Sequence, residues 1–225
     1  MAESAEEVHA RILAAVGPDG RLPVPPYVGW DIFPWEVADG ALVPKVLPGV
    51  ADEPARWGDS DDKPCQACQG FDPERVVWED EYWVLTHAGA PSGLPVVLTL
   101  HPREHLDMGQ LDDELASQLG RITNRLVRII EAVPNVARCH TNRWGDGGAH
   151  LHQMFFGRTA RLAHVLGSPA MEWDDMIPPG PEDVWRADLH AIARRFRALD
   201  HLEVEVHRRR RLLDRHRRLA LLDVD

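Results

Sequence analysis

The spacing of hydrophobic residues near the start of the chain predicts one amphipathic helix over residues 4–16. The apolar residues that share one face of this helix are Val8, Ile12, Leu13 and Val16. Ser4 and Glu7 have the spacing of a capping box. Over residues 17–64 the periodicity disappears, and Pro, Gly and Trp become frequent. Because Trp and Phe side chains need packing partners, we expect this stretch to be an ordered extension rather than a flexible linker.

From residue 65 onward, strand-like and helical patterns alternate. Short runs rich in β-branched, aromatic and other apolar residues predict strands at 76–78, 82–85, 94–100, 136–141 and 149–156. Helical spacing of apolar residues predicts helices at 111–132 and 182–199, and a basic helix over much of 202–222. Hairpins, one long helix and then more strands are typical of an α+β fold rather than of a doubly wound one.

These patterns divide the chain into three segments. Residues 1–64 are predicted to hold the N-terminal helix and the Pro/Trp-rich extension. Residues 65–160 are predicted to form the core, and residues 161–225 a C-terminal helical extension that includes the Arg-rich helix.

The composition is that of a globular protein, with 225 residues, 44% hydrophobic and 27% charged, and no apolar run of membrane-spanning length. Three cysteines imply no disulfide framework, and the chain does not start like a secretory signal, so we expect a cytoplasmic protein. A net charge of −11 argues against general nucleic-acid binding. Residues 208–218 differ, with seven Arg and one Asp. We interpret them as a solvated helical face paired within the protein, with RNA or an acidic partner as alternatives.

Two histidines stand two residues apart in the run Gly148-Ala-His-Leu-His-Gln-Met-Phe-Phe. On a strand, His150, His152 and Met154 would share one face, because successive side chains alternate. The two imidazoles would then be able to bind a metal ion, a phosphate or both. The competing interpretation is a pair of histidines that are hydrogen-bonded within the protein and bind nothing.

Cys65 and Cys68 have the C-x-x-C spacing, which supplies two thiolates from one tight turn and favours zinc. The sequence has no second such pair, so histidines would have to complete a four-ligand site. The candidates are His101, His105, His140 and the pair His150 and His152. A redox role is disfavoured because no βαβ unit is predicted nearby, and two unconnected thiols remain the alternative.

The order of these motifs resembles the histidine triad (HIT) superfamily over about residues 65–158. The matching features are the C-x-x-C pair, the run Val77-Trp-Glu-Asp-Glu-Tyr-Trp-Val-Leu, the run Pro102-Arg-Glu-His-Leu, a long helix, Asn142, a Gly-Gly pair and His-x-His. The motifs are most similar to the galactose-1-phosphate uridylyltransferase and dinucleoside-tetraphosphate phosphorylase branches. The resemblance implies a HIT-like antiparallel sheet with the long helix packed on it, and a homodimer as a possible assembly.

The resemblance implies separate roles for the two histidines. His150 would bind a structural zinc ion together with Cys65, Cys68 and His105. His152 would be the nucleophile that attacks the α-phosphorus of a nucleotide or nucleotide sugar, and the nucleotidyl-histidine would pass to water or an acceptor phosphate. This chemistry is that of a nucleotide-phosphate hydrolase or a nucleotidyltransferase. The residues expected to contact the substrate are Asn142, Gly147, Gly148 and Gln153.

One position departs from the family pattern. Two residues beyond the nucleophile, HIT hydrolases carry a histidine and the transferases a glutamine, whereas this chain has Met154, whose thioether cannot donate a hydrogen bond. Gln153 is one residue early and would point to the other face of a strand. The alternative function is therefore a catalytically inactive HIT-fold protein that binds a nucleotide or a partner. A third is a zinc-dependent hydrolase in which His152 joins the metal shell and a water occupies an open position.

Overall fold

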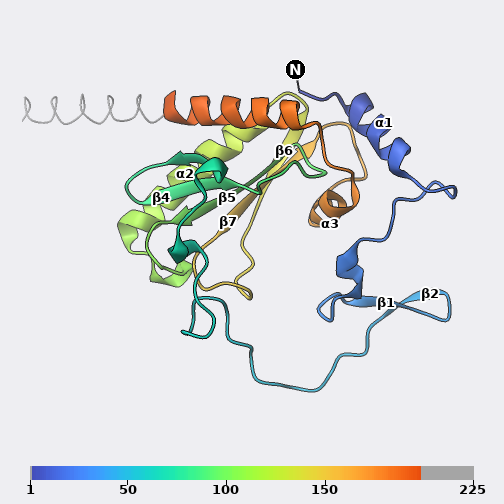
Figure 1. Cartoon of the computed structure of the whole chain (residues 1–225), viewed down its shortest axis with the longest axis horizontal. Coiled ribbons are helices and arrows are strands. Elements are labelled where there is room, and N and C mark those ends of the chain that lie inside the picture. The colour runs from blue at the N-terminus through green and yellow to red at the C-terminus, as the bar shows by residue number, and fades with distance from the viewer. Residues whose placement is uncertain (1, 199–225) are drawn as a thin grey trace, which may run out of the picture.

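The structure of this protein is a computed structural model, and it describes residues 2–198. The predicted basic helix over much of 202–222 and the Arg-rich run at 208–218 lie outside the described residues. The labelled helices and strands, shown in Figure 1, are α1 (Ala5–Ala15), β1 (Trp35–Ala38), β2 (Ala41–Pro44), β3 (Val76–Glu79), β4 (Trp83–His87), β5 (Val96–Pro102), α2 (Asp113–Glu131), β6 (Val136–Asn142), β7 (Gln153–Thr159) and α3 (Pro169–Met176). A further helix covers residues 182–198 and is called the C-terminal helix below.

Strands β3 to β7 form one sheet of five strands in the order β3-β4-β5-β7-β6 (Figure 1). All four pairings in this sheet are antiparallel. Strand β5 lies at the centre, and its Thr99 stands opposite Thr86 of β4 and Met154 of β7. The predicted α+β fold with an antiparallel sheet and one long helix is confirmed.

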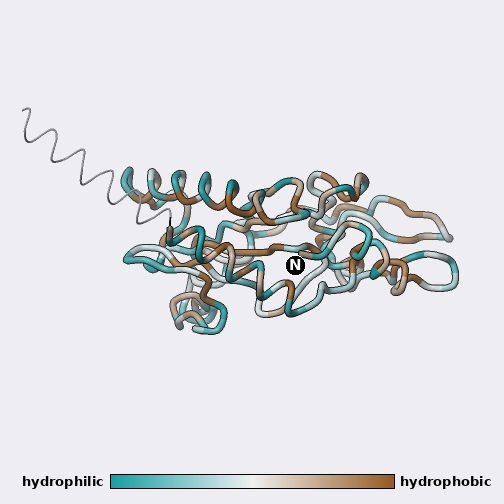
Figure 2. The backbone as a smooth tube through the Cα atoms, turned by 90° about the horizontal axis from the view of Figure 1, so that it is seen from above, coloured by the Kyte–Doolittle hydropathy of each residue, from teal (hydrophilic) through white to brown (hydrophobic). Residues whose placement is uncertain are grey.

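The main core lies between one face of the sheet and two helices. The buried residues of α2 in this cluster are Leu119, Ile122, Leu126, Ile129 and Ile130. The long helix along the upper edge of Figure 2 carries its hydrophobic residues on the side that faces the sheet. The C-terminal helix adds Trp185, Leu189, Ile192 and Phe196 to the same cluster. Residues beyond position 160 thus share the core of the sheet, while the division into three segments stays a prediction.

The opposite face of the sheet carries a smaller apolar cluster. Its buried members, from β5, β7, α3 and neighbouring loops, are Leu94, Val97, Phe156, Val165, Ala170 and Ile177. Met154 of β7 is partly buried and packs against this cluster. No helix among residues 2–198 combines the length and apolar character that crossing a bilayer requires.

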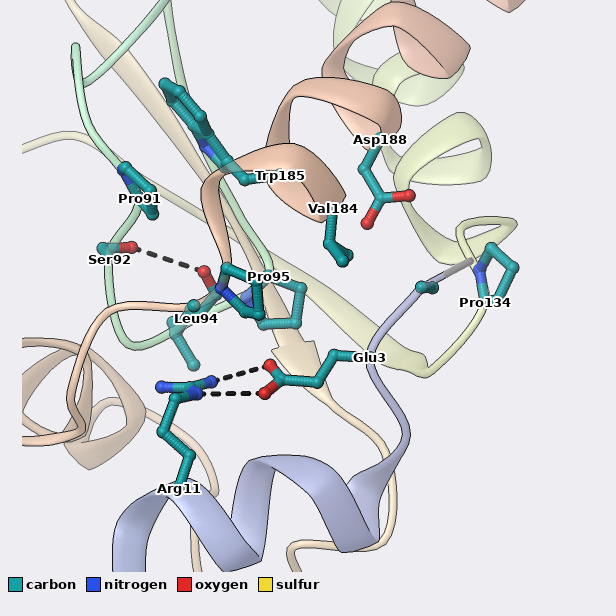
Figure 3. Close-up of a pocket in the computed structure, with 13 residues that line it drawn as sticks. Glu3, Arg11, Pro91, Ser92, Leu94, Pro95, Pro134, Val184, Trp185 and Asp188 are labelled. Carbon is teal, nitrogen blue, oxygen red and sulfur yellow. Dashed lines mark hydrogen bonds and ion pairs between the residues drawn. The ribbon is translucent and has the colours of Figure 1, made fainter. Parts of the chain in front are cut away.

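The N-terminal helix α1 is capped as predicted. The Ser4 side chain accepts a hydrogen bond from the Glu7 backbone N–H at 3.2 Å, and the Ser4 backbone N–H donates to the Glu7 carboxylate at 2.6 Å. Arg11 of α1 binds the Glu3 carboxylate through two hydrogen bonds of 3.0 and 2.8 Å, and both residues line a pocket with Trp185 of the C-terminal helix (Figure 3). The cavity at this junction measures about 30 Å³, room for a water molecule rather than a substrate.

The extension after α1 is less buried than its aromatic residues suggest. The expectation of an ordered extension rather than a flexible linker stays a prediction, but Trp30 and Trp35 remain 58% and 42% exposed. The physical reason is that β1 and β2 pair with each other alone, in a hairpin that Figure 1 shows set apart from the larger sheet.

The strand predicted at 149–156 begins later than expected. Strand β7 starts only after the two histidines, so the prediction that His150 and His152 lie on a strand is wrong. The backbone before β7 is bonded to a loop instead of a neighbouring strand: the Leu151 N–H donates to the Leu106 carbonyl at 2.8 Å. The side chains of His150 and His152 therefore need not point to the same face, as they would on a pleated strand.

Candidate functional site

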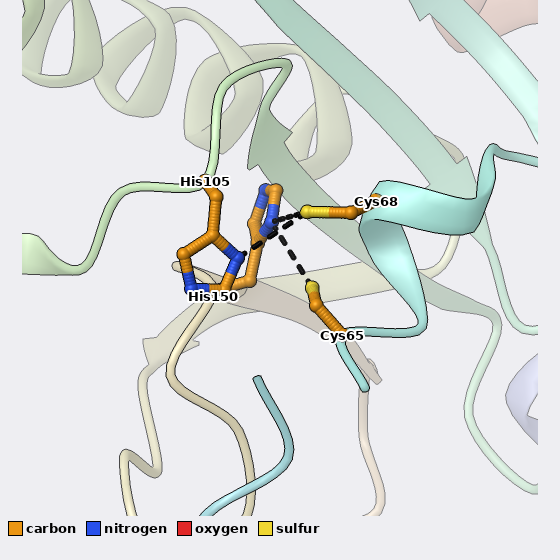
Figure 4. Close-up of side chains that lie close together, drawn as sticks. All are labelled: Cys65, Cys68, His105 and His150. Carbon is orange, nitrogen blue, oxygen red and sulfur yellow. Dashed lines mark hydrogen bonds between the residues drawn. The ribbon is translucent and has the colours of Figure 1, made fainter. Parts of the chain in front are cut away.

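Four side chains from distant parts of the chain converge in one cluster (Figure 4). They are Cys65, Cys68, His105 and His150, the four residues that the resemblance implied as metal ligands. Their sulfur and nitrogen atoms all lie within 4.8 Å of one another. This cluster is called the Cys2His2 cluster below.

The distances within the Cys2His2 cluster fit a tetrahedral zinc ion. The Nδ1 atom of His150 lies 3.5 Å from the Cys65 sulfur and 3.6 Å from the Cys68 sulfur. The Nδ1 atom of His105 lies 3.3 Å from the Cys68 sulfur. Around a tetrahedral zinc with its usual bond lengths, sulfur and nitrogen ligands stand about 3.6 Å apart. The donor set and these three distances therefore suit a metal ion with four protein ligands.

Three loops supply these ligands. Cys65 and Cys68 flank the start of a short 3-10 turn (Ala67–Gln69), His105 follows β5, and His150 precedes β7. Of the other histidine candidates, His101 lies outside the cluster, with its Nε2 atom 3.5 Å from the Thr86 hydroxyl. Burial lowers the pKa of His101 to about 4, so it is a neutral histidine of the interior. His140 and His152 are likewise not members of the cluster.

A backbone carbonyl fixes the orientation of the His150 ring. The carbonyl of Pro102 lies 2.8 Å from the Nε2 atom of His150, and because a carbonyl only accepts, Nε2 must carry the proton. The lone pair then sits on Nδ1, the atom that faces both sulfurs. The ring is only 4% exposed, and burial lowers the pKa of His150, which keeps it in the neutral form that binds metals.

A backbone carbonyl also orients the His152 ring, but it contacts the other ring nitrogen. Its Nδ1 atom lies 2.8 Å from the backbone carbonyl of His150, so Nδ1 carries the proton and donates it to that hydrogen bond. The Nε2 atom of His152 is therefore left with its lone pair. A side-chain carbon at Gly148 would lie 3.6 Å from the His152 ring, so the Gly-rich loop passes directly beside it.

The predicted substrate residues are placed differently from one another. Asn142, at the end of β6, stands opposite Met154 on β7. Met154 follows His152 by two residues in the sequence. Gln153 faces the other side of the sheet, where its side-chain amide donates to the Thr123 hydroxyl of α2 at 3.0 Å. Strand alternation therefore places Gln153 on the helix side, and the predicted contact between Gln153 and substrate has no geometric support.

The N-terminal extension reaches this site, which the sequence did not indicate. Trp57 pairs with the Gly-rich loop: its N–H donates to the Gly147 carbonyl at 3.0 Å, and its carbonyl accepts from the Ala149 N–H at 2.9 Å. Nearby, Asp107 binds both Arg56, at 2.7 Å, and Arg143. This ion cluster ties the extension, the loop after β5 and the loop before β7 together beside the Cys2His2 cluster.

Gly58 of the N-terminal extension lies directly against two of the cluster's residues. Its φ is +97°, and a side-chain carbon there would lie 2.7 Å from the His105 ring and 3.2 Å from the Cys65 side chain. Replacing Gly58 with Ala should displace both ligands and weaken zinc binding at least about tenfold in a chelator competition, an effect of the size seen when metal-site supports are mutated. Gly20→Ala is the matched control, because Gly20 also has a positive φ but has nothing within 4 Å. Equal zinc affinity in the two variants would contradict the proposed contact.

No protein-family model and no curated protein matches this sequence. Among solved structures, the chain is similar to a hypothetical histidine triad nucleotide-binding protein from Sulfolobus tokodaii, with 16% identity and a TM-score of 0.41 over 56% of this chain and 85% of that one. It is also similar to a zinc-bound histidine triad family protein from Mycobacterium smegmatis, with 16% identity and a TM-score of 0.42 over 59% and 93%.

A structure described as a uridylyltransferase is similar as well, with 16% identity and a TM-score of 0.37. That match covers 55% of this chain and 42% of the other, so the chain spans less than half of that protein. Identities of this size describe a likeness between folds, and the chemistry of the site rests on its own residues. The chain is thus similar to histidine triad proteins and to a uridylyltransferase over a little more than half of its length.

Proposed function

We propose that this protein is a nucleotide-phosphate hydrolase or nucleotidyltransferase of the histidine triad type, with His152 as nucleophile. The observation that carries the proposal is the hydrogen bond between His152 Nδ1 and the His150 carbonyl at 2.8 Å. It fixes the tautomer in which Nε2 has a free lone pair, the form that a nucleophilic imidazole needs.

The proposed reaction has two displacements. In the first, Nε2 of His152 attacks the α-phosphorus of a nucleotide, a nitrogen–phosphorus bond forms, and the bond from that phosphorus to the leaving oxygen breaks. In the second, water or an acceptor phosphate attacks the same phosphorus and releases the imidazole. Asn142 and the backbone amide of Gly148 are proposed to face the phosphate oxygens, where N–H donors would stabilise developing negative charge.

Zinc is the metal that the Cys2His2 cluster fits best, and Cys65, Cys68, His105 and His150 would hold it. When bound there, it would supply structural rigidity rather than a reacting group, because all four ligand positions are filled by protein. The resulting anchor at His150 would stiffen the backbone carbonyl that orients His152. The metal site would thereby support the nucleophile without entering the reaction.

An aromatic side chain next to the site supports a nucleotide as the ligand. Trp144 lies in the loop between β6 and His150, is 48% exposed, and its ring centre stands 5.9 Å from that of Phe156. An exposed indole on a supported loop offers a face on which a nucleobase can stack. The cytoplasmic location and the homodimer remain predictions.

One observation favours the second candidate, an inactive protein that binds a nucleotide or a partner. Met154 packs against the apolar cluster on its face of the sheet, and no polar group is supplied at that position. The leaving oxygen then lacks the donor that the family has two residues beyond the nucleophile. If catalysis occurs, another donor must take that role.

The test is a search for the covalent intermediate. The zinc-loaded protein is incubated with dinucleoside polyphosphates and nucleotide sugars, and its intact mass is measured. We expect an added nucleoside monophosphate in the wild type and none in His152→Ala, with turnover reduced at least about a thousandfold, as for loss of a catalytic nucleophile. His9→Ala, at an exposed position of α1, should retain the adduct. Absence of adduct and turnover across the panel would favour the binding-protein alternative.

A further inference from the structure

A basic groove lies between the C-terminal helix and β3, the edge strand of the sheet. The depression has a volume of about 410 Å³, within the range of pockets that hold small molecules. Its lining includes four basic residues of the C-terminal helix, namely Arg186, His190, Arg194 and Arg197. Glu74 is the acidic residue of the lining.

The four basic residues form a single stripe along the helix. They follow one another at intervals of four, four and three residues, which keeps them on one helical face. At 1.5 Å per residue, neighbours are about 6 Å apart and the stripe is about 16 Å long. The adjacent face of the same helix supplies Trp185, Leu189 and Phe196 to the core, so the helix cannot rotate the stripe away from the groove.

Most of this positive charge is not neutralised within the described part of the chain. Arg186 pairs with Glu182 at 2.7 Å, but both side chains are more than half exposed, so the pair is weak. Among residues 2–198, no ion pair engages Arg194 or Arg197. The stripe therefore keeps its attraction for anions in a protein whose overall charge is −11.

The wall opposite the stripe is rigid, and Glu74 is its acidic residue. The Nε2–H of His87 donates to the Glu74 carbonyl at 2.9 Å, and the Gly89 N–H donates to His87 Nδ1 at 2.9 Å. Because both ring nitrogens are engaged, His87 is neutral, in agreement with the pKa lowered by its burial. Its ring packs edge-on against Trp185, with centroids 4.8 Å apart, and so fixes the width of the groove.

The floor of the groove does not suit a peptide. Its apolar members Val77, Leu189 and Ala193 are only 6%, 6% and 9% exposed, so they offer no open pocket for an anchoring side chain. Peptide recognition usually depends on such pockets or on added strand pairing. Arginine, in contrast, binds phosphate oxygens through two parallel hydrogen bonds.

We propose that this groove binds a chain of linked phosphates, either free as polyphosphate or carried by a nucleoside. A single phosphate would reach one or two of the basic side chains, whereas a linear chain can follow the stripe from Arg186 toward Arg197. A second depression of about 560 Å³ shares Val76 and Arg197 with the first and extends to Cys68, so a longer chain would have room to continue. The lining of the groove includes neither His152 nor a residue of the Cys2His2 cluster, and the proposal does not rest on the proposed reaction.

The test is calorimetric titration of the full chain with inorganic tripolyphosphate and with ATP, in the His152→Ala background to prevent turnover. We expect saturable binding of tripolyphosphate that weakens at least about tenfold in the double variant Arg194→Gln/Arg197→Gln, and that weakens further as salt rises. Arg21→Gln/Arg128→Gln removes the same charge from exposed positions outside the groove and should leave the affinity within about twofold.

The two probes distinguish the sources of the phosphate chain. Equal affinities for tripolyphosphate and ATP would support free linked phosphates as sufficient, and tighter binding of ATP that is lost in Arg194→Gln/Arg197→Gln would support a nucleoside-borne chain. Absence of saturable binding to either probe would overturn the proposal. So would an unchanged affinity in Arg194→Gln/Arg197→Gln, which would assign the binding to another basic segment, or tighter binding of a poly-glutamate peptide than of tripolyphosphate.

Discussion

Replacing Cys68 with Ser is expected to release zinc and to destabilise the fold more than any other single change at the site. The Cys68 sulfur lies near both histidine ligands, 3.3 Å from His105 Nδ1 and 3.6 Å from His150 Nδ1, and a serine hydroxyl is a poor replacement for a thiolate. We expect about one zinc per chain in the wild type and nearly none in the variant. In zinc-saturated buffer, the free energy of unfolding should fall by about 4 kcal/mol or more, because loss of a structural metal is among the largest single-site effects.

Cys139→Ser is the matched control for this experiment. Cys139 is half-buried on β6 and lies outside the Cys2His2 cluster, so its replacement should leave the zinc content unchanged. Metal analysis and thermal unfolding with and without a chelator provide the two measurements. A wild-type protein that neither contains nor binds zinc would refute the metal site, whatever the variants do.

Truncation of Phe196 should produce the second large effect, a loss of about 3–5 kcal/mol in the free energy of unfolding. Phe196 is fully buried, and its ring packs edge-on against Trp78 with centroids 4.5 Å apart. Replacement by Ala would therefore leave a cavity between the C-terminal helix and the sheet. Urea unfolding followed by tryptophan fluorescence and by circular dichroism would measure the change and check that both probes report one transition.

His190→Ala on the exposed side of the same helix is the control for Phe196→Ala, and its effect should stay within about 0.5 kcal/mol. A loss of less than about 1 kcal/mol in Phe196→Ala would mean that the helix does not contribute to the core as the structure describes. In that case the basic groove, which depends on the position of this helix, would lose its support as well.

Much of the sheet and both core helices are predictable from local patterns. The apolar run at 94–100 corresponds to β5 with a shift of two residues, and the helix predicted at 111–132 corresponds to α2 (Asp113–Glu131). Each of these elements buries one side against a neighbour, so the spacing of its apolar residues indicates which side is buried. The same pattern does not name the neighbour, which is why the C-terminal helix was predicted as an extension although it packs into the main core.

The site is predictable where its chemistry follows a motif and not where it depends on contacts between loops. The four metal ligands were accessible because the order of C-x-x-C, His105 and His150 matches a known pattern, and their geometry agrees with it. The late start of β7 was not predictable in this way, because it follows from a backbone hydrogen bond between Leu151 and Leu106. The contact of Asp107 with Arg56 was equally hidden, because isolated charged residues in loops show no periodicity.

We infer that the Cys2His2 cluster holds zinc with four protein ligands while His152 stays outside the metal shell. Zinc-edge X-ray absorption of the zinc-loaded protein measures the ligands directly. We expect two sulfur atoms at about 2.3 Å and two nitrogen atoms at about 2.0–2.1 Å, with the same spectrum in His152→Ala. A third nitrogen or oxygen ligand, or a spectrum that changes in His152→Ala, would contradict the claim and place His152 in the metal shell of a zinc-dependent hydrolase.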